Sequence, residues 1–287
     1  MWIKSSISRW RTLCQGALGT LLPNAYFKAF QTGETYQGVL KGVCLPGLNC
    51  YACPTTFCSC AIGTIQNFAA SHQIPFFIIG YLGLIGLAVG RMACGWLCPF
   101  GWLQDILYKL KTKKITLPMS CSYFKYFFLI VLTLALPFST GENWFSMFCP
   151  LGALEGTIPW AVWNPQNPYT QEAIFSYANF GFWFWTKIIL LAFFLVTFII
   201  IKRPFCRMFC PLGAIYSLFN RYSIIRLTVD SKACTGCNTC KNVCPVDLAV
   251  YENPNHPDCI RCLKCTQCVN IRIIHVFSHE KQDSITA

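Results

Sequence analysis

The chain has 287 residues, of which 54% are hydrophobic, 16% are aromatic and only 12% are charged, and its mean hydropathy is +0.45. Soluble domains carry about 25% charged residues, so this composition excludes an ordinary soluble protein and indicates an integral membrane protein. The formal net charge is +12. The basic residues are scattered at the ends of apolar segments rather than gathered on one face, which argues against nucleic-acid binding.

Four apolar segments are candidate membrane spans, at residues 12–27, 74–90, 122–138 and 180–201. The first is the weakest, because it contains polar residues and a proline and is short against the ~20 residues that a spanning helix needs. A further apolar stretch, 144–163, is interrupted by prolines and glycines. Such a pattern favours a re-entrant or interfacial segment over a fifth span.

The basic residues predict the orientation of these spans. With the N-terminus inside, three basic residues before residue 227 fall outside, at Lys28, Lys41 and Lys187. The fourteen on the inner side are Lys4, Arg9, Arg11, Arg91, Lys109, Lys111, Lys113, Lys114, Lys125, Lys202, Arg203, Arg207, Arg221 and Arg226. This bias predicts a multi-pass protein of the cytoplasmic membrane with both termini in the cytoplasm. We attribute the inner charges to topology and to contact with anionic membrane lipid.

An internal repeat carries the first set of cysteines. Segments 74–90 and 180–201 each lead to a basic residue and then to a C-x3-C-P motif, C-G-W-L-C-P-F-G and C-R-M-F-C-P-L-G. The repeat is parallel, so both motifs fall on the cytoplasmic side. We expect this inner set to bind one 4Fe–4S cluster through Cys94, Cys98, Cys206 and Cys210. The alternatives are redox-active dithiols or ordinary buried cysteines.

A second set of cysteines falls on the outer side. The candidates are Cys44, Cys50, Cys53, Cys58, Cys60 and Cys149. Repeat symmetry selects Cys60-Ala-Ile-Gly and Cys149-Pro-Leu-Gly, and a C-x2-C-P motif adds Cys50 and Cys53. These four form a candidate outer cluster site, and disulfides are the rival interpretation on a side that can be oxidising. Cys14 and Cys121 are expected to be ordinary apolar cysteines.

The strongest pattern lies in the polar segment 227–287, which has the double C-x2-C-x2-C spacing of a two-cluster ferredoxin. Because the fourth cysteine of each run ligates the other cluster, we expect two 4Fe–4S clusters. Their predicted ligands are Cys234, Cys237, Cys240 and Cys268 for the first, and Cys259, Cys262, Cys265 and Cys244 for the second. The spacing before Cys268 is one residue short and Val269 replaces the usual proline, so Cys268 is the least regular ligand. Zinc is the alternative metal.

Histidine and catalytic motifs are informative by their scarcity. Only His72 precedes residue 256, so a haem with two histidine ligands inside the bundle is disfavoured and no haem is expected. No glycine-rich nucleotide loop and no acid–base set is found in the sequence. We therefore expect no catalytic residues, and the chain is more readily understood as an electron-transfer subunit of an oxidoreductase complex than as an enzyme by itself.

Three segments resemble the NapH-type family of membrane 4Fe–4S proteins. They are V-C-L-P-G-L-N-C-Y-A-C-P at 43–54, G-R-M-A-C-G-W-L-C-P-F-G-W-L-Q-D at 90–105 and F-C-P-L-G-A-L-E-G at 148–156, and the match continues through 206–214 and the ferredoxin tail. NosR-like membrane proteins and the oxidase-assembly protein CcoG share the C-x3-C-P pair. The resemblance implies electron transfer, from quinol in the case of NapH. This chain departs from the family at Ala61, at the additional Cys58 and at the spacing before Cys268.

The expected fold is an α-helical membrane domain at 1–226, with about four transmembrane helices in two parallel repeats, followed by a cytoplasmic α+β ferredoxin domain at 227–287. The expected function is a relay of single electrons between ferredoxin clusters, membrane clusters and a quinone or a partner reductase. Catalytic or electron-carrier subunits are the expected partners. The alternatives are an assembly or metal-reducing factor of the CcoG type and a redox-sensing membrane protein.

Overall fold

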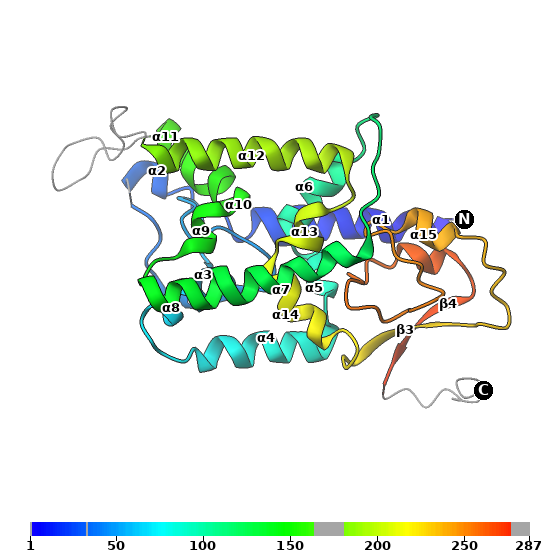
Figure 1. Ribbon diagram of the computed structural model, residues 1–287. Helices are drawn as coiled ribbons and strands as arrows, with labels where there is room; N and C mark the ends of the chain where they lie inside the picture. The colour runs from blue at the N-terminus through cyan, green and yellow to red at the C-terminus, as the bar shows by residue number, and fades with distance from the viewer. Residues whose placement is uncertain (1, 33, 164–180, 277–287) are drawn as a thin grey trace.

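The computed structural model describes residues 2–32, 34–163 and 181–276 and is mostly helical (Figure 1). The axes of the long helical segments are roughly parallel (Figure 1). The first is α1 (Trp2–Leu13), which continues into η1 (Cys14–Leu21), and two others are α4 (Phe76–Val89) and α12 (Phe182–Ile200). The segment Met119–Thr140 is helical throughout. Its pieces are η3 (Met119–Tyr123), α7 (Phe124–Phe127), η4 (Phe128–Ala135) and α8 (Leu136–Thr140).

Two of the described segments, Met119–Thr140 and Phe182–Ile200, are long and apolar enough to cross a membrane. Helix α4 is equally apolar but has only 14 residues. Large apolar side chains on these helices are exposed, among them Phe76 at 76% and Ile189 at 66%, as suits lipid better than water. The structure thus agrees with a membrane location. The predicted spans at 12–27 and 74–90 stay predictions, and the one at 180–201 begins just before the described range.

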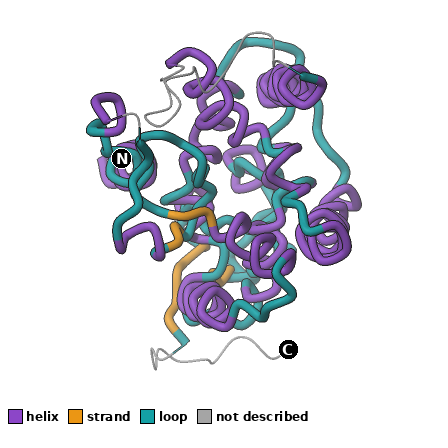
Figure 2. Tube along the Cα trace, turned by 90° about the vertical axis from the view of Figure 1, so that its left-hand side faces the viewer, coloured by secondary structure: helices purple, strands orange, loops and turns teal. Residues whose placement is uncertain are grey.

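Short helices and loops fill the space between the long helices, which appear end-on at the periphery in Figure 2. The predicted interruption of 144–163 is present, because the helical backbone breaks at Cys149 (φ −73°, ψ 117°). A small parallel strand pair joins β1 (Cys44–Leu45) to β2 (Ser59–Cys60). The short helices are α2 (Ala29–Thr32), η2 (Val39–Gly42), α3 (Ala61–Ala70), α5 (Met92–Trp96), α6 (Pro99–Leu107), α9 (Trp144–Phe148), α10 (Pro150–Gly152), η5 (Ala153–Thr157), α11 (Ile158–Trp163), α13 (Pro204–Met208) and α14 (Pro211–Phe219).

The ferredoxin part lies at one end of the bundle (Figure 1). Strand β3 (Ile225–Val229) pairs antiparallel with β4 (Ile271–His275), with Leu227 opposite Ile273. Between the strands lie α15 (Thr239–Val243) and η7 (Lys264–Gln267). The predicted boundary at residue 227 falls inside β3, and the last residues of the predicted domain, 277–287, lie outside the described residues.

Buried polar contacts join the ferredoxin part to the bundle. Arg91 donates to Asp258 at 2.8 Å, and the Asn220 side chain donates to the Cys259 carbonyl at 2.7 Å. Arg261 donates to the carbonyl of Val89, at the end of α4, at 3.0 Å. Because all three donors are at most 1% exposed, the two parts share one interior rather than touching at a wet interface.

Five of the fourteen inner basic residues are at most 4% exposed, namely Arg11, Arg91, Lys125, Arg203 and Arg207. The prediction that these five contact lipid headgroups is therefore wrong. Ion pairs with Asp105, Asp247 and Asp258 hold them inside the protein, because a buried charge requires a partner.

Candidate iron–sulfur sites

Four cysteines stand at helix N-caps. They are Cys60 before α3, Cys98 before α6, Cys149 before α10 and Cys210 before α14. In every case the third residue after the cysteine is a glycine, and at Cys210 the backbone N–H of this glycine, Gly213, donates to the sulfur at 3.3 Å. The first N–H groups of a helix have no partner within the helix, so they can stabilise a thiolate. The C-x2-G unit thus builds the same local site four times.

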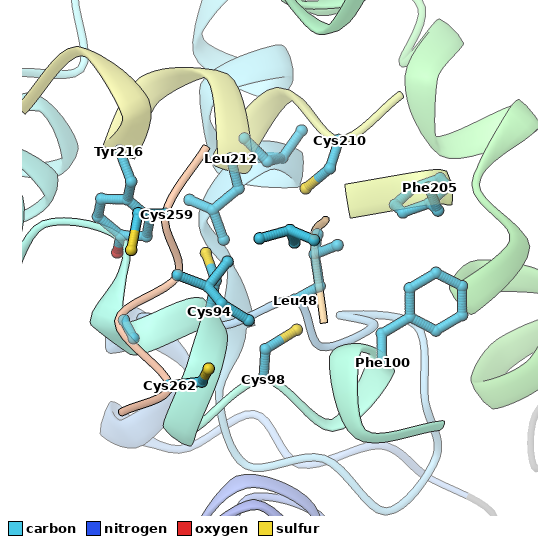
Figure 3. Packing of buried hydrophobic residues seen from close by; sticks show 14 of the residues in the cluster. Leu48, Cys94, Cys98, Phe100, Phe205, Cys210, Leu212, Tyr216, Cys259 and Cys262 are labelled. Atoms are coloured by element: carbon cyan, nitrogen blue, oxygen red, sulfur yellow. The ribbon is translucent and has the colours of Figure 1, made fainter. Parts of the chain in front are cut away.

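The four cysteines of the inner set lie together in the protein interior. They are 3–6% exposed, and the Cys210 thiol lies within electrostatic range of the other three. In Figure 3, Cys98 and Cys210 point inward on either side of Leu48. Burial, followed by the neighbouring thiols, raises the pKa of Cys98 to about 12. Such thiols are deprotonated only by coordination to a metal, so this donor set fits a 4Fe–4S cluster.

The outer set is only partly gathered. The Cys50 thiol lies within electrostatic range of Cys149 and Cys60, and it would lie 3.3 Å from a Cβ at Gly156. Cys53 is tied to Cys50 by a turn, in which Cys53 N donates to the Cys50 carbonyl at 3.2 Å. The structure therefore brings three predicted ligands together directly and holds the fourth next to one of them.

A buried loop lies between the inner and the outer set. The Leu48 backbone lies close to the Cys98 thiol, and the backbone of the next residue, Asn49, lies close to the Cys60 thiol. Both residues are at most 2% exposed. At the preceding Gly47, a Cβ would lie 2.9 Å from the Cys98 Cα, so only glycine allows this approach. Two consecutive peptide groups thus connect the two sets.

The ferredoxin cysteines line two separate pockets. The first is lined by Cys234, Cys237, Cys240 and Cys268, and the second by Cys244, Cys259, Cys262 and Cys265. This is the grouping expected from the spacing, with Cys268 included despite its shortened run. The first pocket is the more open to solvent, because Cys237 is exposed whereas all four cysteines of the second pocket are buried.

The second ferredoxin pocket lies directly against the inner set. A Cβ at Gly95, between Cys94 and Cys98, would lie 2.4 Å from the carbonyl oxygen of Ile260, between Cys259 and Cys262. The neighbouring Trp96 Nε1 donates to the Arg261 carbonyl at 3.1 Å. The two cysteine loops are therefore in backbone contact.

None of the twenty cysteines, all of which lie within the described residues, forms a disulfide. Across residues 2–32, 34–163 and 181–276, no three Cys, His, Asp or Glu side chains converge as a single metal ion would require. The two ferredoxin sets line pockets instead. Their arrangement suits a multi-iron cluster better than a zinc ion, whose four ligands lie about 2.3 Å from one centre.

Comparisons with known proteins agree with these sites. A 4Fe-4S binding domain model matches residues 73–118 and 182–228, and a second matches 227–248. An uncharacterized protein of Methanocaldococcus jannaschii is 31% identical over 72% of this chain and 73% of its own length. The ferredoxin-type protein NapH of Haemophilus influenzae is 26% identical over 89% of this chain and 80% of its own. The chain belongs to the NapH/MauN/NosR-type ferredoxin family.

Each of the two matched copies of the first domain model contains one C-x3-C-P motif of this NapH-type chain. The methylamine utilization ferredoxin-type protein MauN of Methylobacillus flagellatus is 30% identical over 58% of this chain and 52% of its own length. No solved structure matches the chain significantly.

Sequence reasoning missed the polar residues around the inner set of this NapH-type chain. Gln104 donates to the Cys206 sulfur at 3.1 Å. Burial opposes ionisation of Asp258, but Arg91 and Lys125 outweigh it and lower its pKa to about 2. A signal for the arginines was present, because Arg91 and Arg203 both precede the first cysteine of their motif by three residues. The charge pattern by itself indicates only membrane topology and lipid contact for both.

Proposed function

We propose that the chain is a membrane-bound electron-transfer subunit that carries single electrons along four 4Fe–4S clusters. Two clusters are assigned to the ferredoxin pockets, one to Cys94, Cys98, Cys206 and Cys210, and one to Cys50, Cys53, Cys60 and Cys149. The clusters supply one-electron chemistry, and the protein sets their spacing, surroundings and access. The observation that carries this proposal is the contact between successive cysteine sets.

The spacing between the inner and outer sets supports a path across the membrane. The Leu48 backbone approaches the Cys98 thiol and the adjacent Asn49 backbone approaches the Cys60 thiol, so consecutive residues of one loop lie between the two sets. A hydrocarbon core is about 30 Å thick, so clusters confined to its two faces would be poorly coupled. Because the loop carrying Leu48 and Asn49 enters the bundle, the two sets are much closer than the membrane faces.

The repeat gives this path its proposed topology of four spans in two parallel halves, with both termini in the cytoplasm. The two motifs are matched residue for residue, since Arg91, Cys94, Cys98 and Gly101 correspond to Arg203, Cys206, Cys210 and Gly213. Electrons would enter or leave on the cytoplasmic side at the exposed Cys237 pocket. On the other side, the outer set would exchange electrons with a quinone or with a partner subunit.

Iron content tests the proposal. We expect about sixteen irons per chain on anaerobically purified protein, four for each cubane. The double variants Cys94→Ala/Cys206→Ala and Cys60→Ala/Cys149→Ala should each retain about twelve and lose different EPR signals. The matched control is Cys14→Ala/Cys121→Ala, outside all four sets, which should keep the full complement. About eight irons in the unsubstituted protein would confine the clusters to the ferredoxin part and overturn the membrane path.

A second measurement addresses the partner. An electron-transfer subunit should co-purify in fixed ratio with a reductase or an electron carrier, and reduced quinone or that carrier should reduce its clusters. Isolation as a single chain, with loss of cofactor from another enzyme when the gene is deleted, would favour the assembly role instead.

A further inference from the structure

We propose that Arg91 and Arg203 form a crossed pair of buried cations that raises the reduction potential of the inner site. Each arginine comes from one repeat and binds the motif of the other. The inference rests on the inner cluster of the proposed function and assigns these residues as positioning residues that set its potential, with Asp105 and Asp258 as their counter-charges.

Arg91 reaches across to the second repeat. Its side chain is fully buried, its Nη2 donates to the Cys206 carbonyl at 2.9 Å and its Nη1 donates to Asp258 at 2.8 Å. Its Nε is also buried, but within the described residues this atom has no hydrogen-bond partner. The guanidinium lies within electrostatic range of Cys94, Cys206 and Cys210. One N–H is therefore free, and it lies beside the Cys94 thiol, so a cluster bound through Cys94 would bring sulfur acceptors next to it.

Arg203 makes the corresponding contacts with the first repeat. It is 1% exposed, and its Nη1 donates to the Cys94 carbonyl at 3.3 Å. Its Nε and Nη2 bind both oxygens of Asp105 at 2.7 Å. A Cβ at Gly101 would lie 3.0 Å from the Arg203 Nη1, and one at Gly213 would lie 3.0 Å from the Arg91 Nη2. The glycines of both C-P-x-G units thus leave room for the arginine of the other repeat.

The ion pairs leave positive charge on both sides of the site. Asp258 is shared by Arg91 and Lys125, and Asp105 is shared by Arg203 and Arg11. In each group two cations surround one carboxylate. Burying an uncompensated charge is costly. Two buried groups that each carry an excess positive charge are therefore expected only where a nearby anion balances them. A cluster held by four thiolates is an anion, and it becomes more negative on reduction.

The sign of the effect follows from this charge. A nearby cation favours the reduced, more negative cluster and raises its potential, as do hydrogen bonds to its sulfur. Removing an arginine should therefore lower the potential, and removing its carboxylate should raise it. A general loosening of the site would not shift the potential in opposite directions for the arginine and the carboxylate variants.

The test is an EPR-monitored redox titration of the inner cluster in the full-length protein. At a fixed potential, Arg203→Gln should lower the ratio of reduced to oxidised inner cluster about tenfold, which is ~59 mV for a one-electron couple. Asp105→Asn should raise it, and the Arg203→Gln/Asp105→Asn double variant should return towards the original value. Arg91→Gln should lower the ratio as Arg203→Gln does. Arg91→Lys keeps the positive charge, so it should leave the ratio close to its original value. The matched control is Arg9→Gln, an exposed arginine on α1, which should leave the ratio unchanged.

The outcomes separate this inference from the proposed function. If iron content and EPR show no inner cluster in the unsubstituted protein, the proposed function fails. If the cluster is present but Arg203→Gln and Asp105→Asn shift its potential in the same direction, or neither shifts it, the crossed-pair inference is wrong and the relay stands. Iron content is measured for every variant, and Arg91→Lys provides the charge-retaining comparison if a glutamine variant fails to load.

Discussion

At the residue scale, the cysteines supply the ligands, but glycines decide how closely the sites approach each other. Gly95 lies against the Ile260 carbonyl, and Gly47 lies against the Cys98 backbone. A side chain at either position would push two cysteine loops apart. Glycine thus stands where two cysteine loops are in backbone contact. It is needed there because it has no Cβ, and not because of its backbone freedom.

Gly95→Ala should separate the inner set from the second ferredoxin pocket. Its Cβ would lie 2.4 Å from a backbone oxygen, which cannot move away as a flexible side chain could. We expect a loss of about 1–3 kcal/mol in the free energy of unfolding, as for other overpacked sites. Electron transfer from the ferredoxin clusters to the inner cluster should slow, as followed by freeze-quench EPR.

The matched control for this change is Gly80→Ala in α4, where a Cβ would contact nothing within 4 Å. It should be neutral or should stabilise the helix by about 0.5–1 kcal/mol. Equal stability and equal transfer rates in the two variants would show that the Gly95 contact has no role.

At the scale of elements, the outer loop determines the distance between the membrane sites. The loop is anchored on both sides, because Asn49 Nδ2 donates to Thr56 Oγ1 at 2.8 Å and Asn24 Nδ2 donates to Asn49 Oδ1 at 3.1 Å. These bonds hold the Leu48 and Asn49 backbone close to the Cys98 and Cys60 thiols. The loop is therefore a fixed part of the interior and not a surface connection.

Gly47→Ala should weaken coupling between the inner and outer clusters without removing a ligand. The added Cβ would lie 2.9 Å from the Cys98 Cα and would displace the loop. Iron content should stay near that of the unsubstituted protein, while the outer cluster is reduced more slowly. Gly42→Ala, in the same loop region but with nothing within 4 Å, is the control. If Gly47→Ala loses about four irons as well as slowing reduction of the outer cluster, Gly47 supports cluster ligation and not coupling.

The ferredoxin part is docked by a buried ion-pair group, and Asp258 is its centre. It binds Arg91 at 2.8 Å and also contacts Lys125 and Ser122. Removing one partner of a buried ion pair typically costs about 3–5 kcal/mol, because the other charge is left uncompensated. Asp258→Asn should therefore increase proteolytic cleavage between α14 and β3. Glu252→Gln, which changes an exposed acid of the same domain, should leave this cleavage unchanged. Equal cleavage of the two variants would contradict a docking role.

At the scale of the whole molecule, the arrangement predicts that the two ends of the bundle face different compartments. The ferredoxin part lies at one end, and the loop at Gly141 follows α8 near the other (Figure 1). Alkaline phosphatase fused after Gly141 should be active, because this loop is expected outside. The same reporter fused after Lys111, in the loop between α6 and η3, should be inactive. Activity at both positions, or the reverse pattern, would contradict the proposed four-span topology.

The sequence by itself determined the family, the iron–sulfur character and the grouping of the ferredoxin cysteines. These follow from short spacings such as C-x2-C-x2-C, in which neighbouring ligands are fixed by local backbone geometry. Apolar runs likewise identified the segments 122–138 and 180–201, since a span depends on length and composition alone. The two C-x3-C-P motifs could be matched because they share their spacing, but the spacing gave no distance between them.

Only the tertiary structure decided what surrounds the cysteines. Charge counting placed Arg91 and Arg203 at the membrane surface, because a basic residue beside an apolar run is usually solvated there. In the folded chain each is buried against the other C-x3-C-P motif, a contact between residues more than one hundred positions apart. The approach of Leu48 and Asn49 to both membrane sites is also non-local. Such contacts depend on how segments pack, and local pattern does not encode them.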